Sequence, residues 1–485
     1  MPTDPQRRRL LKLAGASMAL GGLGLQPGGV RAAAAPAVAD IAIVGAGLSG
    51  LTTARDLQRA GCDSFVVLEA RNRVGGRTLN HELGGGQVSD AGGQWIGPGQ
   101  TAVADLAREL GAGTVNTYYA GKTVILGGQG RLAVDLRGTL GSDKAIAARL
   151  SALARDVPAG APWTSARRAE LDRMTLGDWL VQQGIKPQDR VGWDLSAQLT
   201  GGSSPSMIGL LHFVANINSG DSDFHRIEEI RDSAQESYFA EGAQSLSLKM
   251  AASLGRKLRL SCPVRRISGW NTDTVRLHTD QGEMQARRVV MALHPALCNR
   301  IEFSPALPED RAALQRDWPA FAPLRKTAMV YRRPFWRQRG LNGQVLQFGG
   351  PVMWSWDHSP ASEEIGVISA FVHAGQLPSD PRHAQRMLTQ IYARALGDEA
   401  LQPLSFHDQD WATADEWAHT CLPAVPAGFW SRHGDALRRP CGNLIWSGTE
   451  TAERWVGYMD GAVSAGRRSA RQALFALRQA PELRP

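Results

Sequence analysis

Residues 41–50 read Ile-Ala-Ile-Val-Gly-Ala-Gly-Leu-Ser-Gly, and this stretch decides the fold of the chain. The apolar residues predict a buried strand, the glycines predict a tight turn, and the residues up to Ala60 predict a helix. Gly45 permits the turn, Gly47 lets the backbone approach a pyrophosphate, and Gly50 lets the helix pack against the strand. Free N–H groups at the start of the helix would hold the phosphate charge. The pattern therefore predicts a Rossmann-type dinucleotide site.

A second predicted strand, residues 65–68, is followed by Glu69, whose carboxylate can accept hydrogen bonds from the adenosine ribose hydroxyls. FAD and NAD both fit this much of the pattern. Residues 71–78, Arg-Asn-Arg-Val-Gly-Gly-Arg-Thr, favour FAD, because two glycines let the chain approach a ligand and Arg77 can form charge-assisted bonds to phosphate. A solvated basic loop is the alternative for residues 71–78 taken alone.

Ahead of the dinucleotide motif, residues 7–12 read Arg-Arg-Arg-Leu-Leu-Lys, and an apolar stretch rich in glycine and alanine follows. This order is typical of a secretory signal, and paired arginines ahead of Leu-Leu-Lys resemble a twin-arginine signal. We expect residues 1–35 to be an export signal and the mature protein to be periplasmic or secreted. A Sec signal or a disordered basic tail is the alternative. The apolar stretch is too short and too rich in glycine to anchor the chain stably in a membrane.

The composition excludes several classes of protein. The chain has 485 residues, 43% of them hydrophobic, which is enough for two layered domains with a sizeable core. Its formal net charge is +8, and half of that charge comes from the first 31 residues, so the remainder has no basic footprint for nucleic acid. The sequence has no CxxC pair and no HExxH motif, so we expect no metal site.

Three further motifs carry a resemblance to a known family. Residues 90–98 read Asp-Ala-Gly-Gly-Gln-Trp-Ile-Gly-Pro, Lys326 lies in the apolar stretch 324–331, and residues 446–466 contain Ser-Gly-Thr-Glu and then Gly-Tyr-Met-Asp-Gly. Together with the two glycine motifs, they resemble the flavin amine oxidases, such as monoamine oxidases and putrescine oxidases, over about residues 38–478. The resemblance implies an α/β fold, in which a Rossmann-type FAD-binding domain is interleaved with a mixed α+β substrate domain.

The resemblance also implies domain boundaries and site residues. The FAD-binding domain would take residues 38–115, 240–315 and 421–478, and the substrate-binding domain would take residues 116–239 and 316–420. The residues expected to contact FAD are Gly45, Gly47, Ser49, Gly50, Glu69, Arg71, Gly76, Arg77, Gly93, Gln94, Trp95, Val264, Trp411, Cys421, Gly448, Glu450, Gly457 and Met459. The residues expected to bind the substrate or act on it are Lys326, Tyr458, Gln235, Leu422 and Glu228.

The activity implied by the resemblance is hydride transfer from the carbon next to an amine nitrogen to flavin N5. The resulting imine is hydrolysed to an aldehyde, and reoxidation by oxygen gives hydrogen peroxide. Lys326 matches a lysine that holds a water against N5, and its charge can favour the reduction of oxygen. Tyr458 matches a tyrosine whose ring flanks the amine. Leu422 stands at the second ring position, so the aromatic cage is half-built, and Trp354 and Trp417 are candidates for the missing wall.

The predicted helix 459–477 begins beside Tyr458 in the same motif. Its N-terminus carries roughly half a positive charge, which would stabilise the anionic reduced flavin. Val264 matches a residue whose backbone holds adenine, and a buried strand residue is the alternative. Gln235 matches a residue that lines the amine cavity, and a solvent-facing turn is the alternative.

Two predictions depend on single residues. Six acidic residues crowd segment 221–236, and Glu228 falls near the gate of the amine cavity, where it would attract a second ammonium group; an acidic surface loop is the alternative. Cys421 lies at about the spacing at which part of the family binds FAD covalently through a thioether, although Thr420 and the following Leu-Pro differ from those members. A buried cysteine without this bond is the alternative.

Three other functions stay open. An L-amino acid oxidase needs an arginine to clamp the carboxylate, and residues 92–101 contain no arginine or lysine, which favours a plain amine. A non-catalytic flavin carrier is disfavoured by Lys326 and Tyr458. A dehydrogenase that passes electrons to a periplasmic carrier fits as well as an oxidase. The expected partners are thus a small amine and either oxygen or an electron carrier, and the choice between monomer and homodimer is open.

Overall fold

The dinucleotide motif lies at the centre of the largest sheet. In the computed structural model, which describes residues 38–128, 130–136, 143–319, 324–411, 413, 416–417 and 424–479, β1 (Val38–Val44) has parallel neighbours on both sides. These are β2 (Phe65–Leu68) and β13 (Gly282–Met291). The last four residues of β1 and all of β2 are buried, as expected of parallel strands covered on both faces.

This sheet has eight strands in the order β10–β2–β1–β13–β12–β11–β14, and β20 pairs with β13. The remaining strands are β10 (Leu258–Arg259), β11 (Val264–Ser268), β12 (Val275–Thr279), β14 (Glu302–Ser304) and β20 (Leu444–Trp446). The sheet therefore draws its strands from three separate parts of the chain, all within the segments predicted for the FAD-binding domain.

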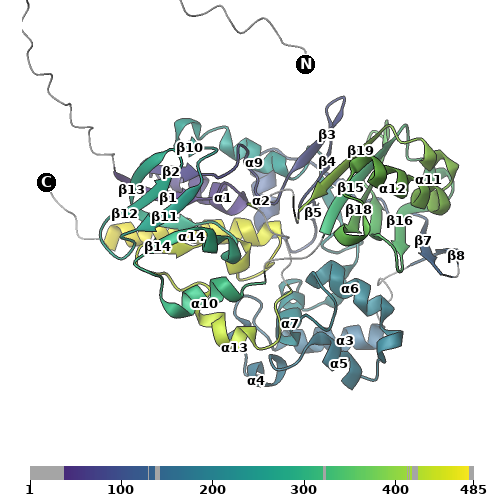
Figure 1. The fold of residues 1–485 in the computed structure, drawn as a ribbon, viewed down its shortest axis with the longest axis horizontal. Coiled ribbons are helices and arrows are strands. Elements are labelled where there is room, and N and C mark those ends of the chain that lie inside the picture. The colour runs from purple at the N-terminus through teal and green to yellow at the C-terminus, as the bar shows by residue number, and fades with distance from the viewer. Residues whose placement is uncertain are drawn as a thin grey trace, which may run out of the picture. The chain divides into compact units, whose positions relative to one another are not determined.

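Two helices from opposite ends of the chain pack together on this sheet (Figure 1). They are α1 (Leu48–Arg59), which follows the glycine turn, and α14 (Met459–Gln479). Gly466 allows the close contact, because a Cβ atom there would lie 2.4 Å from the carbonyl oxygen of Ser49. Helices α2 (Thr101–Glu109) and α9 (Gln244–Ala251) add apolar residues to the same core.

A second, antiparallel sheet carries Lys326. Its strand order is β17 (Val352–Asp357), β18 (Gly366–His373), β15 (Leu324–Tyr331) and β19 (Ser405–Asp410). Helix α12 (Pro381–Leu396) packs into a core with this sheet. That core includes residues of a small sheet of β16 (Leu341–Gln347), β7 (Lys122–Gly127) and β8 (Gly130–Val134) and of α11 (Phe335–Gln338).

The segment between β8 and β9 is helical and has its own apolar core, which contains Trp163, Trp179, Trp193 and Phe213. Its helices are α3 (Lys144–Arg155), α4 (Arg168–Leu171), α5 (Leu176–Gln182), α6 (Val191–Gly201), α7 (Leu210–Ser219) and α8 (Phe224–Glu228). Two later helices, α10 (Glu309–Asp317) and α13 (Phe429–His433), contribute residues to the same core.

Short strands hold the motif at residues 90–98 in place. The hairpin of β3 (Asn80–Gly84) and β4 (Gln87–Asp90) ends at the first residue of that motif. Strand β5 (Trp95–Ile96) then pairs with β9 (Ser237–Phe239), which also pairs with β6 (Thr114–Asn116). The loop between β4 and β5 is thus fixed at both ends.

The fold class expected from the sequence is confirmed: the chain has a parallel dinucleotide-binding sheet and further mixed sheets and helices. The observed β2 covers the predicted residues 65–68, and α14 begins at the predicted Met459. The domain boundaries stay a prediction, and residues 1–35, Cys421 and Leu422 lie outside the described residues. Within the part of the chain that the structure describes, no helix is long and apolar enough to cross a membrane.

Candidate functional site

A first cavity runs along the carboxyl ends of β1 and β2 and, with the open space at its mouth, spans about 1210 Å³. A crevice at this edge is where open α/β sheets bind ligands. Most residues expected to contact FAD line it. They are Gly45, Gly47, Ser49, Glu69, Arg71, Gly76, Arg77, Gly93, Val264, Gly448, Gly457 and Met459.

The three glycines of the first motif differ in their surroundings. Gly45 has a φ of +105°, and a Cβ atom there would lie 2.6 Å from the carbonyl oxygen of Ala292. At Gly50 a Cβ atom would lie 1.9 Å from the carbonyl oxygen of Gly45. At Gly47 it would meet only the Cα atom of Gly76, at 3.8 Å. Gly45 and Gly50 are therefore required by packing, whereas Gly47 keeps the wall of the cavity open.

Glu69 stands at the end of β2 with its carboxylate anchored. Its Oε2 atom accepts a hydrogen bond from the backbone N–H of Ala46 (2.7 Å), and its Oε1 atom accepts one from that of Arg71 (3.0 Å). Oε1 also accepts a bond from Nη1 of Arg71 (3.4 Å), so Oε2 is the oxygen that can accept a further bond from a ribose hydroxyl in the cavity that Glu69 lines. Ser49 faces the other side, where its Oγ accepts the N–H of Gly448 (3.1 Å).

Arg77 and Glu450 form an ion pair of 2.7 Å, in which the carboxylate of Glu450 is buried. Burial opposes ionisation of Glu450, but the charge of Arg77 and that of His294 outweigh it and hold the pKa of Glu450 below its usual value. The ion pair therefore ties the 71–78 motif to the C-terminal motif. Glu450 lines neither cavity directly, and Gly50 is buried inside its turn.

A second cavity, of about 1090 Å³, lies beside the first and is lined mainly by apolar and aromatic side chains. Residues expected to contact either the cofactor or the substrate line it. They are Gln94, Trp95, Glu228, Gln235, Lys326, Trp411 and Tyr458. Trp411 also donates its indole N–H to the carbonyl oxygen of Ala91 (2.7 Å), so it braces the 90–98 motif from the side of this cavity.

The two cavities meet. Arg77, Gly93, Gly457, Tyr458 and Met459 line both of them. A ligand that fills the first cavity from Glu69 to this junction would therefore present one end to the second cavity. The N-terminus of α14 begins at Met459, so its partial positive charge faces the same place.

The side chains of the first cavity fit FAD. The start of α1 carries no side-chain cap, which leaves N–H groups for a pyrophosphate, and Gly47 leaves room for its approach. Glu69 and Val264 line the part of the cavity that would take the adenosine, and the shared residues would hold the flavin ring. Among the residues that the structure describes, no cluster of three or more His, Cys, Asp or Glu could hold a metal ion.

Lys326 is 3% exposed, and its ammonium group is fully engaged at the edge of the second cavity. Its Nζ atom donates to the carbonyl oxygen of Gly92 and to Oε1 of Gln94, both at 2.8 Å. The ring centroids of Trp95, Trp356 and Phe371 lie 5.5, 5.3 and 5.9 Å from Nζ. Such ring faces attract a cation, so three aromatic rings surround the ammonium group beside its two hydrogen-bond acceptors.

The structure places the two candidates for the missing aromatic wall in different cavities. Trp354 lines the second cavity with Tyr458 and stacks on Trp95 at a centroid distance of 5.5 Å. Trp417 lines the first cavity instead, where the guanidinium groups of Arg265 and Arg300 both lie 5.4 Å from its ring. Trp354 therefore lines the cavity that holds Lys326, and Trp417 lines the cavity that holds Glu69.

Gln235 and Glu228 are both placed in the wall of the second cavity. The side-chain amide of Gln235 donates to the carbonyl oxygen of Ile227 (3.1 Å), which fixes the turn after α8. Glu228 is 6% exposed, so it does not lie on a freely solvated surface loop. Glu228 and Trp354 also line a third, outer cavity, which makes them the boundary between the two spaces.

Sequence reasoning missed part of this site. Phe371 and Trp356 had no role assigned, although Trp354 and Trp356 are two residues apart in an apolar stretch, which is the signal of one face of a strand. The Arg77–Glu450 ion pair joins distant segments and leaves no local signal.

Comparison with known proteins agrees with this geometry. Residues 48–474 match the family model described as flavin containing amine oxidoreductase. A putative flavin-containing monoamine oxidase of Mycobacterium tuberculosis is 35% identical over 451 residues, which are 90% of this chain and 96% of that protein. The structure of wild-type putrescine oxidase bound to putrescine aligns with a TM-score of 0.81 and 28% identity, over 90% of this chain and 99% of that one. Cyclohexylamine oxidase from Brevibacterium oxydans aligns with a TM-score of 0.82 and 29% identity, over 91% and 100%.

The different surroundings of Gly47 and Gly50 predict different consequences of adding a methyl group. Gly47→Ala should weaken FAD binding by at least about tenfold, or ~1.4 kcal/mol, while thermal unfolding without added FAD stays unchanged. Gly50→Ala should lower the stability of the protein itself by at least about 1–3 kcal/mol, because the new atom would overlap the Gly45 carbonyl. FAD titration and thermal unfolding of both variants provide the measurement. Equal losses of stability in the two variants would contradict this assignment.

Proposed function

The chain belongs to the flavin-containing amine oxidoreductase family, and from that premise we propose that it is an FAD-dependent oxidase that removes a hydride from the carbon next to an amine nitrogen. The product is an imine, which water hydrolyses to an aldehyde, with release of ammonia when the amine is primary. Oxygen takes up the electrons and leaves as hydrogen peroxide. The observation that carries the proposal is the junction of the two cavities at Tyr458 and Met459, with the buried ammonium group of Lys326 in the wall of the second.

The second cavity prepares the amine for this reaction. FAD, when bound, supplies the hydride acceptor. The rings of Tyr458, Trp354 and Trp95 would orient the amine, because their electron-rich faces attract it and their walls limit its positions. The apolar lining excludes water and lowers the pKa of the bound ammonium, so that the neutral form, whose lone pair is free, is populated.

Two positive groups lie in the walls around the junction. Lys326 lies in the wall of the second cavity, and α14 begins at Met459 with the positive end of its dipole. Both favour negative charge at the junction, which develops there as electrons arrive and again as oxygen is reduced.

The rival substrate class, L-amino acids, lacks an evident carboxylate clamp in this cavity. The cationic side chains among its described lining residues are Arg77 and Lys326. Arg77 is paired with Glu450, and Lys326 is held by Gly92 and Gln94. This arrangement favours a plain amine. Between oxidase and dehydrogenase, the yield of hydrogen peroxide per amine oxidised decides.

The proposal also covers where the protein acts. We retain export by a twin-arginine signal in residues 1–35 and a periplasmic or secreted location as part of it, on the strength of the sequence alone. Expression of the full chain in a bacterium, with and without Arg7-Arg8 replaced by lysines, would test this by the fraction of flavin recovered in the periplasm.

The experiment that tests the function is anaerobic mixing of the FAD-loaded protein with a panel of amines. Bleaching of the flavin absorbance by at least one amine, with aldehyde formed in equal amount, is the expected result. Bleaching by L-amino acids alone would favour the rival substrate class. Absence of any bound flavin after reconstitution would end the proposal.

Replacing Lys326 with methionine should leave FAD bound but slow the reoxidation of the flavin by oxygen about ten- to a thousandfold, the scale expected for one electrostatic group. Stopped-flow mixing of the reduced protein with oxygen measures the rate. Lys122→Met, in the outer cavity, is the control and should have the wild-type rate. An unchanged rate in Lys326→Met would show that Lys326 does not act at the flavin.

Glu228 should favour amines that carry a second positive charge, because its buried carboxylate closes the far side of the amine cavity. The structure of putrescine oxidase, whose ligand is such a diamine, is similar to this one. Glu228→Gln should lower kcat/KM for putrescine relative to benzylamine about ten- to a hundredfold, which corresponds to about 1.5–3 kcal/mol for a charge-assisted hydrogen bond. Glu229→Gln is the matched control, because Glu229 lines the outer cavity and not the amine cavity. A constant ratio in both variants would remove Glu228 from substrate selection.

A covalent link between FAD and Cys421 remains a proposal that rests on sequence spacing alone. If the thioether exists, acid precipitation leaves the yellow colour with the protein, and Cys421→Ala releases it into the supernatant. Colour that is wholly in the wild-type supernatant, with no FAD increment in the protein mass, would show that the bond does not form.

A further inference from the structure

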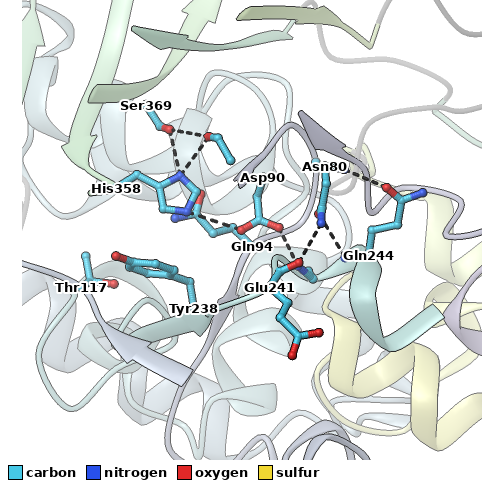
Figure 2. Close-up of polar contacts among 12 residues, drawn as sticks. Asn80, Asp90, Gln94, Thr117, Tyr238, Glu241, Gln244, His358 and Ser369 are labelled. Carbon is cyan, nitrogen blue, oxygen red and sulfur yellow. Dashed lines mark hydrogen bonds and ion pairs between the residues drawn. The ribbon is translucent and has the colours of Figure 1, made fainter. Parts of the chain in front are cut away.

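A buried aspartate and a buried histidine lie behind the loop that holds Lys326. Asp90 and His358 are 2% and 4% exposed, and Oδ2 of Asp90 lies 3.5 Å from Nε2 of His358. Figure 2 shows the imidazole of His358 between the carboxylate of Asp90 and the hydroxyl of Ser369. Neither residue lines the first cavity, here called the cofactor cavity, or the second cavity, here called the amine cavity. The chemistry described above therefore does not use them.

The position of the His358 ring is fixed from several directions. Its Nδ1 atom lies 3.1 Å from Oγ of Ser89 and 3.0 Å from Oγ of Ser369, so both ring nitrogens have polar partners. The ring of Tyr238 meets it edge-on at a centroid distance of 4.6 Å. A buried histidine with this many contacts has one orientation, which is a requirement for a group that positions others.

The Asp90 side of the pair belongs to the cofactor half of the site. Oδ1 of Asp90 accepts the backbone N–H of Ala243 (2.7 Å), at the start of α9. Asn80, its partner in the β3–β4 hairpin, is also held to this region, because its side-chain amide donates to the carbonyl oxygen of Glu241 (2.8 Å) (Figure 2). The hairpin is thus fixed to the segment before α9. Asp90, at the end of the hairpin, contacts His358.

The His358 side of the pair belongs to the sheet that carries Lys326. Ser369 lies in β18, two residues from Phe371, which is the pairing partner of Lys326 in β15. The residues directly after Asp90 supply the two acceptors of the lysine, the carbonyl oxygen of Gly92 and the side chain of Gln94. The Asp90–His358 contact therefore connects the strand of the lysine with the loop that binds its ammonium group.

We propose that Asp90 and His358 are positioning residues for Lys326, which hold residues 91–94 against β15 and β18 so that the ammonium group stays at the edge of the amine cavity. The inference rests on the proposed function in one respect, namely that Lys326 acts on the flavin. Asp90 and His358 act through the loop and touch neither substrate nor cofactor.

The charges around His358 agree with a structural, uncharged imidazole. Burial lowers the pKa of His358, and the charge of Lys326 adds to this effect, while Asp90 and Asp357 oppose it without cancelling it. A neutral imidazole can donate one N–H and accept at the other nitrogen, which suits a carboxylate on one side and hydroxyl groups on the other.

The test is a double-mutant cycle between His358→Asn and Lys326→Met in the FAD-loaded protein. Two quantities are measured, the rate of flavin reoxidation by oxygen and the reduction potential of the bound FAD. His358→Asn alone should slow reoxidation, by up to about a hundredfold if Lys326 moves by ~1 Å, and should shift the potential in the same direction as Lys326→Met. In the Lys326→Met background, His358→Asn should change the rate by less than about twofold.

Two further variants complete the design. Asp90→Asn keeps the shape of the side chain and should give the same pattern if His358→Asn fails to fold. His433→Asn removes another buried histidine that pairs with a carboxylate, at 2.9 Å from Asp317, in α13 and away from both cavities; it should change neither quantity.

Equal effects of His358→Asn with and without Lys326 would overturn the inference, as would wild-type behaviour of both His358→Asn and Asp90→Asn. If Lys326→Met alone changes neither the rate nor the potential, the proposed action of Lys326 on the flavin is wrong. In that case, the free energy of unfolding is measured for the same single and double variants. Non-additive losses of stability for His358→Asn and Lys326→Met would support positioning, and additive losses would contradict it.

Discussion

The buried ammonium group of Lys326 is the constraint on which the rest of the site depends. Removing such a charge from water costs on the order of several kcal/mol unless polar partners replace the water. The partners come from Gly92 and Gln94, in the loop that follows the β3–β4 hairpin, while the lysine itself comes from the second sheet. The hydrogen bonds of this one ammonium group therefore require that the loop after β4 and strand β15 lie at a fixed distance from each other. The rings of Trp95, Trp356 and Phe371 complete the enclosure, because aromatic faces tolerate a cation where water is excluded.

The meeting of the two parts also joins the cavities. The first cavity follows the ends of β1 and β2, as the Rossmann arrangement dictates, and the second cavity is lined by aromatic side chains of the second sheet and by α8 and its following turn. Two of the five residues that line both cavities, Gly93 and Gly457, have no side chain, so only backbone fills those parts of the shared wall. The Arg77–Glu450 ion pair and the start of α14 fix this junction from the cofactor side.

The sequence predicted the features that local physics determines. The glycine turn, the strand before Glu69 and the start of the helix at Met459 follow from residue types that are adjacent in the chain, and the structure has them where expected. Contacts between segments that are distant in the chain were harder to predict from the sequence. Trp354 and Trp417 were equal candidates for one wall because nothing in the sequence fixes the side of a loop on which a tryptophan lies, and the structure separates them between two cavities. The Asp90–His358 contact depends on the register of the hairpin and of β18, which no motif encodes.

The central claim is that a ligand in the amine cavity touches the flavin at the junction lined by Tyr458 and Met459. The most direct measurement is a titration of the FAD-loaded protein with an amine that has no hydrogen on the carbon next to nitrogen, and therefore binds without reacting. Visible absorbance follows the flavin, and calorimetry follows binding. The account predicts a saturable change in the flavin spectrum with the same dissociation constant as the heat signal. Calorimetric binding of this amine at a single site that leaves the flavin spectrum unchanged would contradict the account.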